Sequence, residues 1–305
     1  MKYIYLNPEE IIGTPQFEFV MSFLKATGRT QLGWHYFIDL AWICSQVEKW
    51  PRTFRILDAG GGSGPTQFLL AELGFNVTNI DLFLSAPASK IQTRYRMRYS
   101  VSENYQETTY VTHLSAIKKR KNSLKKLKRL IGGGKFYQKI VSKKYQKQHD
   151  KWRTENRIAG EVGQLNWTQG NLCNLPEIAT DSFDAVVSLS ALEHIPIEQL
   201  PQAWKEIQRI CTSEAKAAVT TSATEQPTMW FHQASQGWCF SEEDMKKTFH
   251  ALPAEENLPA EEIIAQYRTC NFLKENIAKF YSKSGDNGMP WGKWDPKYFP
   301  VGLFR

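Results

Sequence analysis

Short apolar runs of strand length recur along this chain and alternate with stretches of helical spacing. Runs begin near residues 54, 165, 183, 216 and 298, and another ends at Asp81. The run at 183–189 is nearly continuous in apolar residues, which is typical of a strand buried on both faces. Strands that alternate with helices predict a doubly wound α/β fold, with a ligand at the carboxyl ends of the strands.

The fifty residues before the first of these runs are helical by pattern. Apolar side chains recur at helical spacing over 17–24 and 37–47, which predicts two helices. Such helices either cap a sheet edge or help to form a substrate cavity. We expect a helical cap at 1–52, a core at 53–83 and 164–224, an insertion at 84–163, and a substrate-side region at 225–305 that includes the last strand.

A glycine turn joins the first strand to the helix that follows it. Asp58 is followed by Gly60, Gly62 and Gly64, at every second position. Glycines allow sharp turns and let a ligand approach backbone N–H groups without hindrance from Cβ atoms. Asp81, at the end of the next strand, is placed to accept hydrogen bonds from two ribose hydroxyls. The segment therefore predicts a nucleoside-binding βαβ unit.

This turn does not match the Gly-x-Gly-x-x-Gly fingerprint of dinucleotide-binding proteins. That pattern would need glycine at Pro65 or at Gln67, depending on the register. The turn instead resembles motif I of the class I S-adenosylmethionine-dependent methyltransferases. A glycine-rich turn of another α/β protein is the alternative. In the methyltransferases the loop meets the methionine half of the cofactor.

A second motif agrees with this resemblance. Gly170-Asn171-Leu172 is similar to the family's Gly-Asp-hydrophobic turn, which meets the adenine edge, and 191–196 is similar to its segment after strand four. The resemblance implies S-adenosylmethionine as cofactor and a Rossmann-like, doubly wound, mostly parallel sheet of seven strands. The pattern of this chain adds N-terminal helices and a basic helical insertion to that core. It implies a cofactor site made of Asp58, Gly60, Gly61, Gly62, Gly64, Asp81, Leu82, Asn171, Leu172 and Ser188, and no metal.

Charge is unevenly distributed along the chain. The net charge is +7, yet residues 116–153 hold 15 of the 38 Lys and Arg and one of the 31 Asp and Glu. The rest of the chain is therefore acidic, and its basicity belongs to the insertion. Compact members of the resembling family need only a short helix and loop at this place.

The insertion predicts a basic helix with a narrow apolar stripe over 114–131, followed by Gly132–Gly134 and a second basic stretch. Such a helix is typical of an interfacial element. The stretch 114–152 is expected to contact an anionic membrane surface, or to dock an acidic substrate. RNA contact is disfavoured because few aromatic residues are interleaved for base stacking. A solvated hairpin that packs its stripe on the domain is the alternative.

No apolar run approaches the ~20 residues that span a bilayer, and no secretory signal is recognised at the start. The five cysteines show no CxxC spacing, which favours reduced thiols over a disulfide or zinc framework. We expect a cytoplasmic protein, peripheral at a membrane if the insertion binds lipid.

Candidate catalytic residues are histidines, because an alcohol acceptor must lose a proton during methyl transfer. His194 follows strand four, while His35 and His232 lie on aromatic loops. For His194 the alternative is a residue that only begins a helix. We expect methylation of an oxygen, or a nitrogen, of a small molecule, glycan or lipid-linked sugar. An RNA-directed enzyme and a catalytically silent methyltransferase-like interaction protein are the alternatives.

Overall fold

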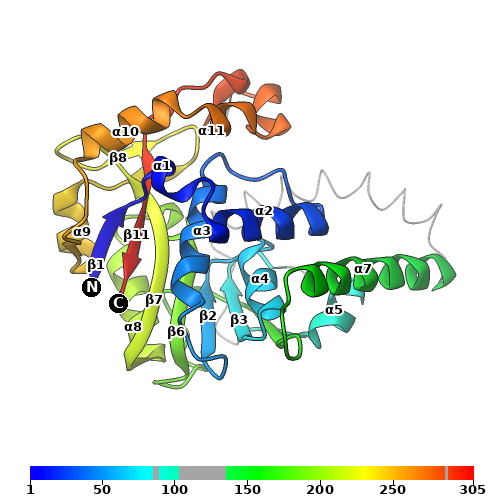
Figure 1. Ribbon diagram of the computed structural model, residues 1–305. Helices are drawn as coiled ribbons and strands as arrows, with labels where there is room; N and C mark the ends of the chain where they lie inside the picture. The colour runs from blue at the N-terminus through cyan, green and yellow to red at the C-terminus, as the bar shows by residue number, and fades with distance from the viewer. Residues whose placement is uncertain (85–88, 103–134, 286–287) are drawn as a thin grey trace.

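The computed structural model of the protein describes residues 1–84, 89–102, 135–285 and 288–305 (Figure 1). The predicted apolar stripe at 114–131 lies outside these residues. The strands are β1 (Lys2–Tyr5), β2 (Arg55–Ala59), β3 (Asn76–Asp81), β4 (Arg98–Val101), β5 (Leu165–Gln169), β6 (Phe183–Leu189), β7 (Cys211–Ala223), β8 (Trp230–His232), β9 (Gly237–Cys239), β10 (Leu252–Pro253) and β11 (Phe299–Phe304).

The helices alternate with the strands through the core. They are α1 (Pro8–Ile11), α2 (Pro15–Thr27), α3 (Tyr36–Val47), α4 (Thr66–Glu72), α5 (Ser89–Tyr95), α7 (Lys135–Glu155), α8 (Leu200–Ile210), α9 (Glu242–Phe249), α10 (Ala260–Thr269) and α11 (Asn271–Glu275), with the 3-10 turns η1 (Leu192–His194), η2 (Lys279–Lys283) and η3 (Pro290–Gly292). Both N-terminal helices expected from the pattern are present, as α2 and α3.

Within the described residues the main sheet has nine strands in the order β10-β1-β11-β7-β6-β2-β3-β5-β4. Strands β4, β5, β3, β2, β6 and β7 run parallel, and β11 is antiparallel to β7. The first core strand, β2, is central, and the chain winds outward from it in both directions. The Rossmann-like fold predicted from the sequence is confirmed, although the sheet has nine strands where seven were expected.

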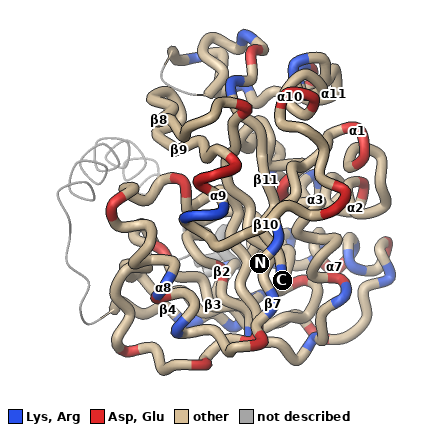
Figure 2. The backbone as a smooth tube through the Cα atoms, turned by 90° about the vertical axis from the view of Figure 1, so that its left-hand side faces the viewer, with Lys and Arg blue, Asp and Glu red and all other residues tan. Residues whose placement is uncertain are grey.

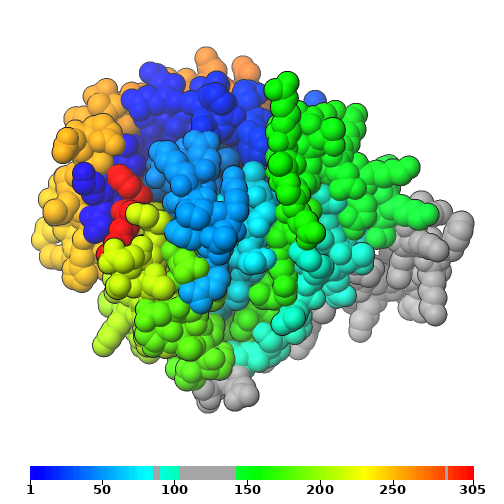
Figure 3. All heavy atoms as spheres, turned by 60° about the horizontal axis from the view of Figure 1, so that its bottom comes forward, coloured from blue at the N-terminus to red at the C-terminus, as the bar shows by residue number. Residues whose placement is uncertain are grey.

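One additional strand, β1, comes from the N-terminal segment. It pairs antiparallel with β11 and parallel with the short β10. Tyr3 and Tyr5 are buried, Ile4 between them is half-buried, and Lys2 is exposed. Four residues with this alternation are too few to stand out beside the longer helical pattern that follows. In Figure 3 these N-terminal residues, in dark blue, lie beside the last strand, in red.

The insertion returns to the core through α7, which packs on α2 and α5. The indole of Trp152 lies between Phe19 and Phe23, with ring centroids 5.1 Å from each, and donates to the hydroxyl of Ser22 at 2.8 Å. This described part of the basic stretch therefore packs on the domain, and it gives no support to contact with a membrane or with nucleic acid.

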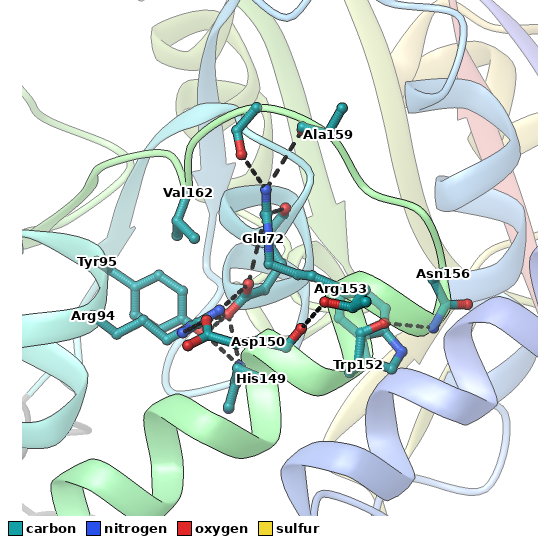
Figure 4. Close-up of polar contacts among 12 residues, drawn as sticks. Glu72, Arg94, Tyr95, His149, Asp150, Trp152, Arg153, Asn156, Ala159 and Val162 are labelled. Carbon is teal, nitrogen blue, oxygen red and sulfur yellow. Dashed lines mark hydrogen bonds and ion pairs between the residues drawn. The ribbon is translucent and has the colours of Figure 1, made fainter.

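A buried ion cluster also ties α7 to the core (Figure 4). The carboxylate of Glu72, on α4, is fully buried and accepts hydrogen bonds from Arg94 at 2.7 Å and from the Tyr95 hydroxyl at 2.9 Å. The carboxylate also lies 2.7 Å from Nδ1 of His149. Arg153, on α7, donates a hydrogen bond to the backbone carbonyl of Glu72. We call Glu72, Arg94, Tyr95, His149 and Arg153 the α7 anchor.

Three further features of the described residues concern membrane-spanning helices, cysteines and metal ligands. In the described part of the chain no helix is both long and apolar enough to cross a membrane. All five cysteines are free, and the described residues contain no group of side chains spaced to hold a metal ion.

Candidate active site

The glycine turn after β2 lies directly against the segment that follows β6. Gly60 has φ +74°, and a Cβ atom there would lie 2.6 Å from Cβ of Ala191. Gly62 also has a positive φ, +51°. Side chains other than hydrogen are therefore strained at both positions. The backbone of the turn therefore lies against the segment that follows β6, at the carboxyl ends of β2 and β6.

A polar network that the sequence analysis missed holds this turn. The carbonyl of Gly62 accepts hydrogen bonds from Nδ2 of Asn79 at 2.7 Å and Nε2 of Gln67 at 3.1 Å. The side-chain oxygen of Gln67 accepts from Asn79 at 3.1 Å and from the indole of Trp167. Buried amides are costly unless hydrogen-bonded, so this network specifies one loop conformation. The sequence signal that could have predicted this network is the presence of two amide side chains, Gln67 and Asn79, within otherwise apolar segments.

Asp58 lies beneath the turn and is fully buried. Neither of its carboxyl oxygens has a hydrogen-bond partner among the described residues. Burial, reinforced by the nearby charge of Asp81, raises the pKa of Asp58 to about 8. An orphaned carboxyl group of this kind fits a ligand that brings a cationic group, as S-adenosylmethionine does with its ammonium and sulfonium centres.

Asp58→Asn is expected to stabilise the ligand-free protein while weakening its affinity for S-adenosylmethionine. Ionising a carboxyl group whose pKa is raised costs folding free energy that grows as the pH rises from about 4 to 8. The variant avoids this cost, so its free energy of unfolding at pH 8 should be greater by roughly 1–3 kcal/mol. Urea titrations at pH 5 and pH 8 check the result. A difference between the two proteins that shrinks as the pH rises would contradict it.

Asp81 ends β3 next to the turn. One carboxyl oxygen accepts a hydrogen bond from the backbone N–H of Phe83 at 2.6 Å. The other lies 3.5 Å from where a Cβ atom on Gly62 would sit. The carboxylate thus faces the glycine turn, as the predicted ribose site requires. The carbonyl of the next residue, Leu82, accepts from the side chain of Gln169 at 3.1 Å.

Two of the predicted cofactor residues use their side chains otherwise. The side-chain oxygen of Asn171 accepts from the backbone N–H of Cys173 at 3.0 Å and closes its own turn. An amide oxygen has two lone pairs, so the expected contact of this oxygen with adenine stays a prediction. Ser188 is fully buried, and its hydroxyl donates to the carbonyl of Ala59 at 2.8 Å, which ties β6 to β2. Leu172 is buried beside the Asn171 turn.

A cavity of about 390 Å³ lies next to the segment after β6. Its walls bring together two histidines predicted from the sequence, a buried acid and several aromatic rings, and we call it the acceptor cavity. Among its lining residues are His35, Tyr36, Glu193, His194, Tyr281 and Tyr298. His232 does not line it, but its ring lies 5.1 Å from that of Tyr298, and its Nδ1 lies 2.7 Å from the hydroxyl of Ser235.

His35 forms a buried pair with an aspartate that the sequence analysis did not single out. Its Nδ1 lies 2.7 Å from a carboxyl oxygen of Asp39, one helical turn later at the start of α3. The same oxygen accepts from the hydroxyl of Ser190, just after β6, at 3.0 Å. The pair therefore sits at the carboxyl end of β6, beside the glycine turn.

His194 is more exposed and is held by a backbone group. It ends the 3-10 turn η1, and its Nδ1 lies 2.8 Å from the carbonyl of Gln236. Because a carbonyl only accepts, Nδ1 carries the proton and Nε2 of the neutral ring is left as an acceptor. The predicted catalytic role is compatible with this position, whereas the alternative of a residue that begins a helix does not match the last residue of the turn.

A larger groove, of about 1030 Å³, lies over β1 and between α9 and α10, where acidic segments gather (Figure 2). It is lined by Tyr3, Tyr5 and several glutamates. Its lining residues include none from the glycine turn or from the segment after β6. The groove is therefore a separate site from the glycine turn.

A family model for a methyltransferase domain matches residues 132–219. This match runs from the insertion to β7 and leaves the glycine turn and Asp81 outside it. The sequence has no significant match among curated proteins.

Solved structures similar to the chain include YcgJ of Bacillus subtilis, with 14% identity and a TM-score of 0.30. The alignment covers 60% of this chain and 49% of YcgJ, so this chain matches about half the length of that protein. The 1,6-didemethyltoxoflavin-N1-methyltransferase of Burkholderia thailandensis has 14% identity over 80% of this chain and 77% of that chain, with a TM-score of 0.40. The [4+2]-cyclase SpnF has 12% identity over 90% and 83%, with a TM-score of 0.46.

The doubly wound sheet, the glycine turn with its orphaned carboxyl group, and the matching domain model agree with one another. The chain has a doubly wound α/β fold, and over residues 132–219 it is similar to a methyltransferase domain.

Proposed function

We propose that this enzyme methylates an oxygen or nitrogen atom of a small molecule bound in the acceptor cavity. The observation that carries the proposal is the buried side chain of His35, which lines that cavity and pairs with Asp39 behind it. It lies at the carboxyl end of β6, which is where ligands bind in doubly wound folds.

S-adenosylmethionine supplies a methyl group already activated on a sulfonium, so the difficult chemistry belongs to the cofactor. Asp81 and the turn at Gly60 and Gly62 would hold it, with Asp58 beneath its cationic half. The chain must then orient the acceptor and exclude water. The burial of His35 and Asp39 serves both requirements.

His35 is the proposed general base. The carboxylate of Asp39 accepts a hydrogen bond from the N–H at Nδ1, which leaves Nε2 as the basic nitrogen. The acceptor hydroxyl or amine would pass its proton to Nε2 as it takes up the methyl group, and the methyl–sulfur bond of the cofactor would break with its electron pair returning to sulfur. The charge of Asp39 stabilises the imidazolium that results. His194, also with a basic Nε2, is the second candidate, and His232 lies outside the lining.

The acceptor cavity favours a ligand with a flat or hydroxylated body. Its described lining includes three tyrosines and no Lys or Arg. A sugar hydroxyl fits such a wall, whereas a phosphate group would lack a cationic partner there. A glycan or lipid-linked sugar would therefore keep its phosphates outside this cavity.

His35→Asn is expected to lower kcat about 100-fold, because general base catalysis typically contributes that much or more. An acceptor is first identified by transfer of radiolabelled methyl groups to a panel of small alcohols, amines and free glycans. Affinity for S-adenosylhomocysteine should stay unchanged, since His35 lies in the acceptor wall. Asp39→Asn should act in the same direction, because an amide at that position favours the other tautomer.

His250→Asn is the matched control, since His250 is exposed at the end of α9 in a left-handed conformation that Asn tolerates. Full activity in His35→Asn would contradict the proposed base. Failure of every compound in the panel to accept a methyl group would contradict a small-molecule acceptor.

A further inference from the structure

Glu193 presents a buried acid to the acceptor cavity. It lies in η1, directly after β6, and only 2% of its surface is exposed. Its two carboxyl oxygens accept hydrogen bonds from the hydroxyls of Thr221 at 3.0 Å and Ser222 at 3.3 Å. Both donors come from the carboxyl end of β7. These contacts orient the carboxyl group but supply no positive charge.

Aromatic rings surround the same cavity. Tyr36, Phe280, Tyr281 and Tyr298 all belong to its lining. The hydroxyl of Tyr298 accepts from the indole N–H of Trp34, and that of Tyr281 from its backbone N–H, each at 3.1 Å. One residue thus orients two rings. The faces of such rings attract cations, most strongly where water is excluded.

The charges in the wall are unbalanced. Within the described lining residues Glu193 is the one acid, and no Lys or Arg accompanies it. A buried carboxylate without a cationic partner is costly, and burial raises the pKa of Glu193. The titratable groups that face it are His35, Tyr36, His194 and Cys239.

We infer that the acceptor carries a protonated amine, which binds between the carboxylate of Glu193 and the rings of Tyr281 and Tyr298. This inference rests on the proposed function, because it places the amine in the cavity that holds the acceptor. The amine serves as an anchor. It leaves another part of the molecule to face Nε2 of His35. A neutral polyol would use the hydroxyl-binding capacity of Glu193 but would leave its charge uncompensated.

The test compares ligands of similar shape and different charge. We would titrate the protein, saturated with S-adenosylhomocysteine, with 2-phenylethylamine, 2-phenylethanol and phenylacetate by calorimetry. The amine is expected to bind at least tenfold more tightly than the alcohol, and phenylacetate most weakly. Glu193→Gln, which keeps the shape of the side chain, should bring the amine within about twofold of the alcohol.

Glu214→Gln is the control, because Glu214 is exposed on β7 and lies outside the cavity lining. The comparison of ligands on the unaltered protein needs no variant, so it stands even if Glu193→Gln folds poorly. Equal binding of amine and alcohol, no saturable binding of the amine, or a preference that survives in folded Glu193→Gln would each overturn the inference.

The proposed function fails separately from this inference. Full activity in His35→Asn would overturn the assigned base while leaving a measured preference for amines intact. An amine preference that is absent from a protein whose activity depends on His35 would overturn the cation site alone.

Discussion

Asp81→Ala is expected to lower the affinity of the enzyme for S-adenosylmethionine about 1,000-fold. The Asp81 carboxylate ends β3 and faces the glycine turn, with one oxygen near Gly62. Hydrogen bonds from two ribose hydroxyls to a charged group contribute about 1.5–3 kcal/mol each. Losing both is worth about 4 kcal/mol, and each 1.4 kcal/mol is a factor of ten in affinity.

The variant also removes the acceptor for the N–H of Phe83, so a second variant separates the two effects. Asp81→Asn keeps an oxygen for that N–H and loses the charge, and we expect an intermediate affinity. Asp181→Asn is the surface control, because Asp181 is exposed with a positive φ that Asn also adopts. Calorimetric titration with S-adenosylmethionine measures all three. A dissociation constant within threefold of the unaltered protein in Asp81→Ala would place the ribose elsewhere.

Glu72→Gln is expected to lower the free energy of unfolding by about 3–5 kcal/mol, the usual cost of removing one partner from a buried ion cluster. Glu72 is fully buried, and its carboxylate balances Arg94 and lies 3.7 Å from Arg153. The amide would remove the charge that faces Arg153 and would leave Arg94 with Asp150, 2.8 Å away, as its acidic partner. Urea unfolding at pH 7 measures the change.

Acid should reduce this difference in a defined direction. Hydrogen bonds from Arg94 and His149 outweigh burial and lower the pKa of Glu72 from 4.5 to about 2. A carboxylate with a lowered pKa stabilises the fold fully above pH 4.5 and loses that contribution as the pH falls towards 2. The gap between Glu72→Gln and the unaltered protein should therefore narrow between these values.

Glu243→Gln serves as the control, because Glu243 pairs with Lys247 on the exposed face of α9. Surface pairs of this kind contribute little, so the change should stay below about 0.5 kcal/mol. A Glu72→Gln protein as stable as this control would mean that the α7 anchor does not hold the insertion on the core.

The core of the fold could be predicted because its signals are local. The strand, turn and helix from 54 to 72 are encoded in one continuous segment, and so are the apolar runs of β6 and β7. Strand β1 was missed because its four residues gain their stability from a partner almost the whole chain away. An alternation of four residues is too short to distinguish a strand from a chance pattern.

In the candidate site, too, single residues could be predicted from local sequence, whereas their distant partners could not. His35 and His194 were identified singly from their loops, and they line one cavity. The partners that define their roles were not identifiable, because the sequence does not show distant contacts. Asp39 meets Ser190 across 151 positions, and Glu193 meets Thr221 from the next strand. For Asn171 the motif predicted its place after β5, and the hydrogen bond that its side-chain oxygen accepts from Cys173 was not identifiable from the motif.

The pairing of β1 with β11 has a consequence for how the protein is made. Residues 2–5 are translated before the other described strands, whereas their neighbour in the sheet, 299–304, is translated after them. During synthesis β7 lacks its neighbour on that side, because β11 fills the position between β7 and β1. Open strand edges favour aggregation, and pairing between distant segments is slow. The nascent chain is thus most vulnerable while the rest of the sheet waits for its last strand, and chaperones that shield strand edges have most to contribute in that interval.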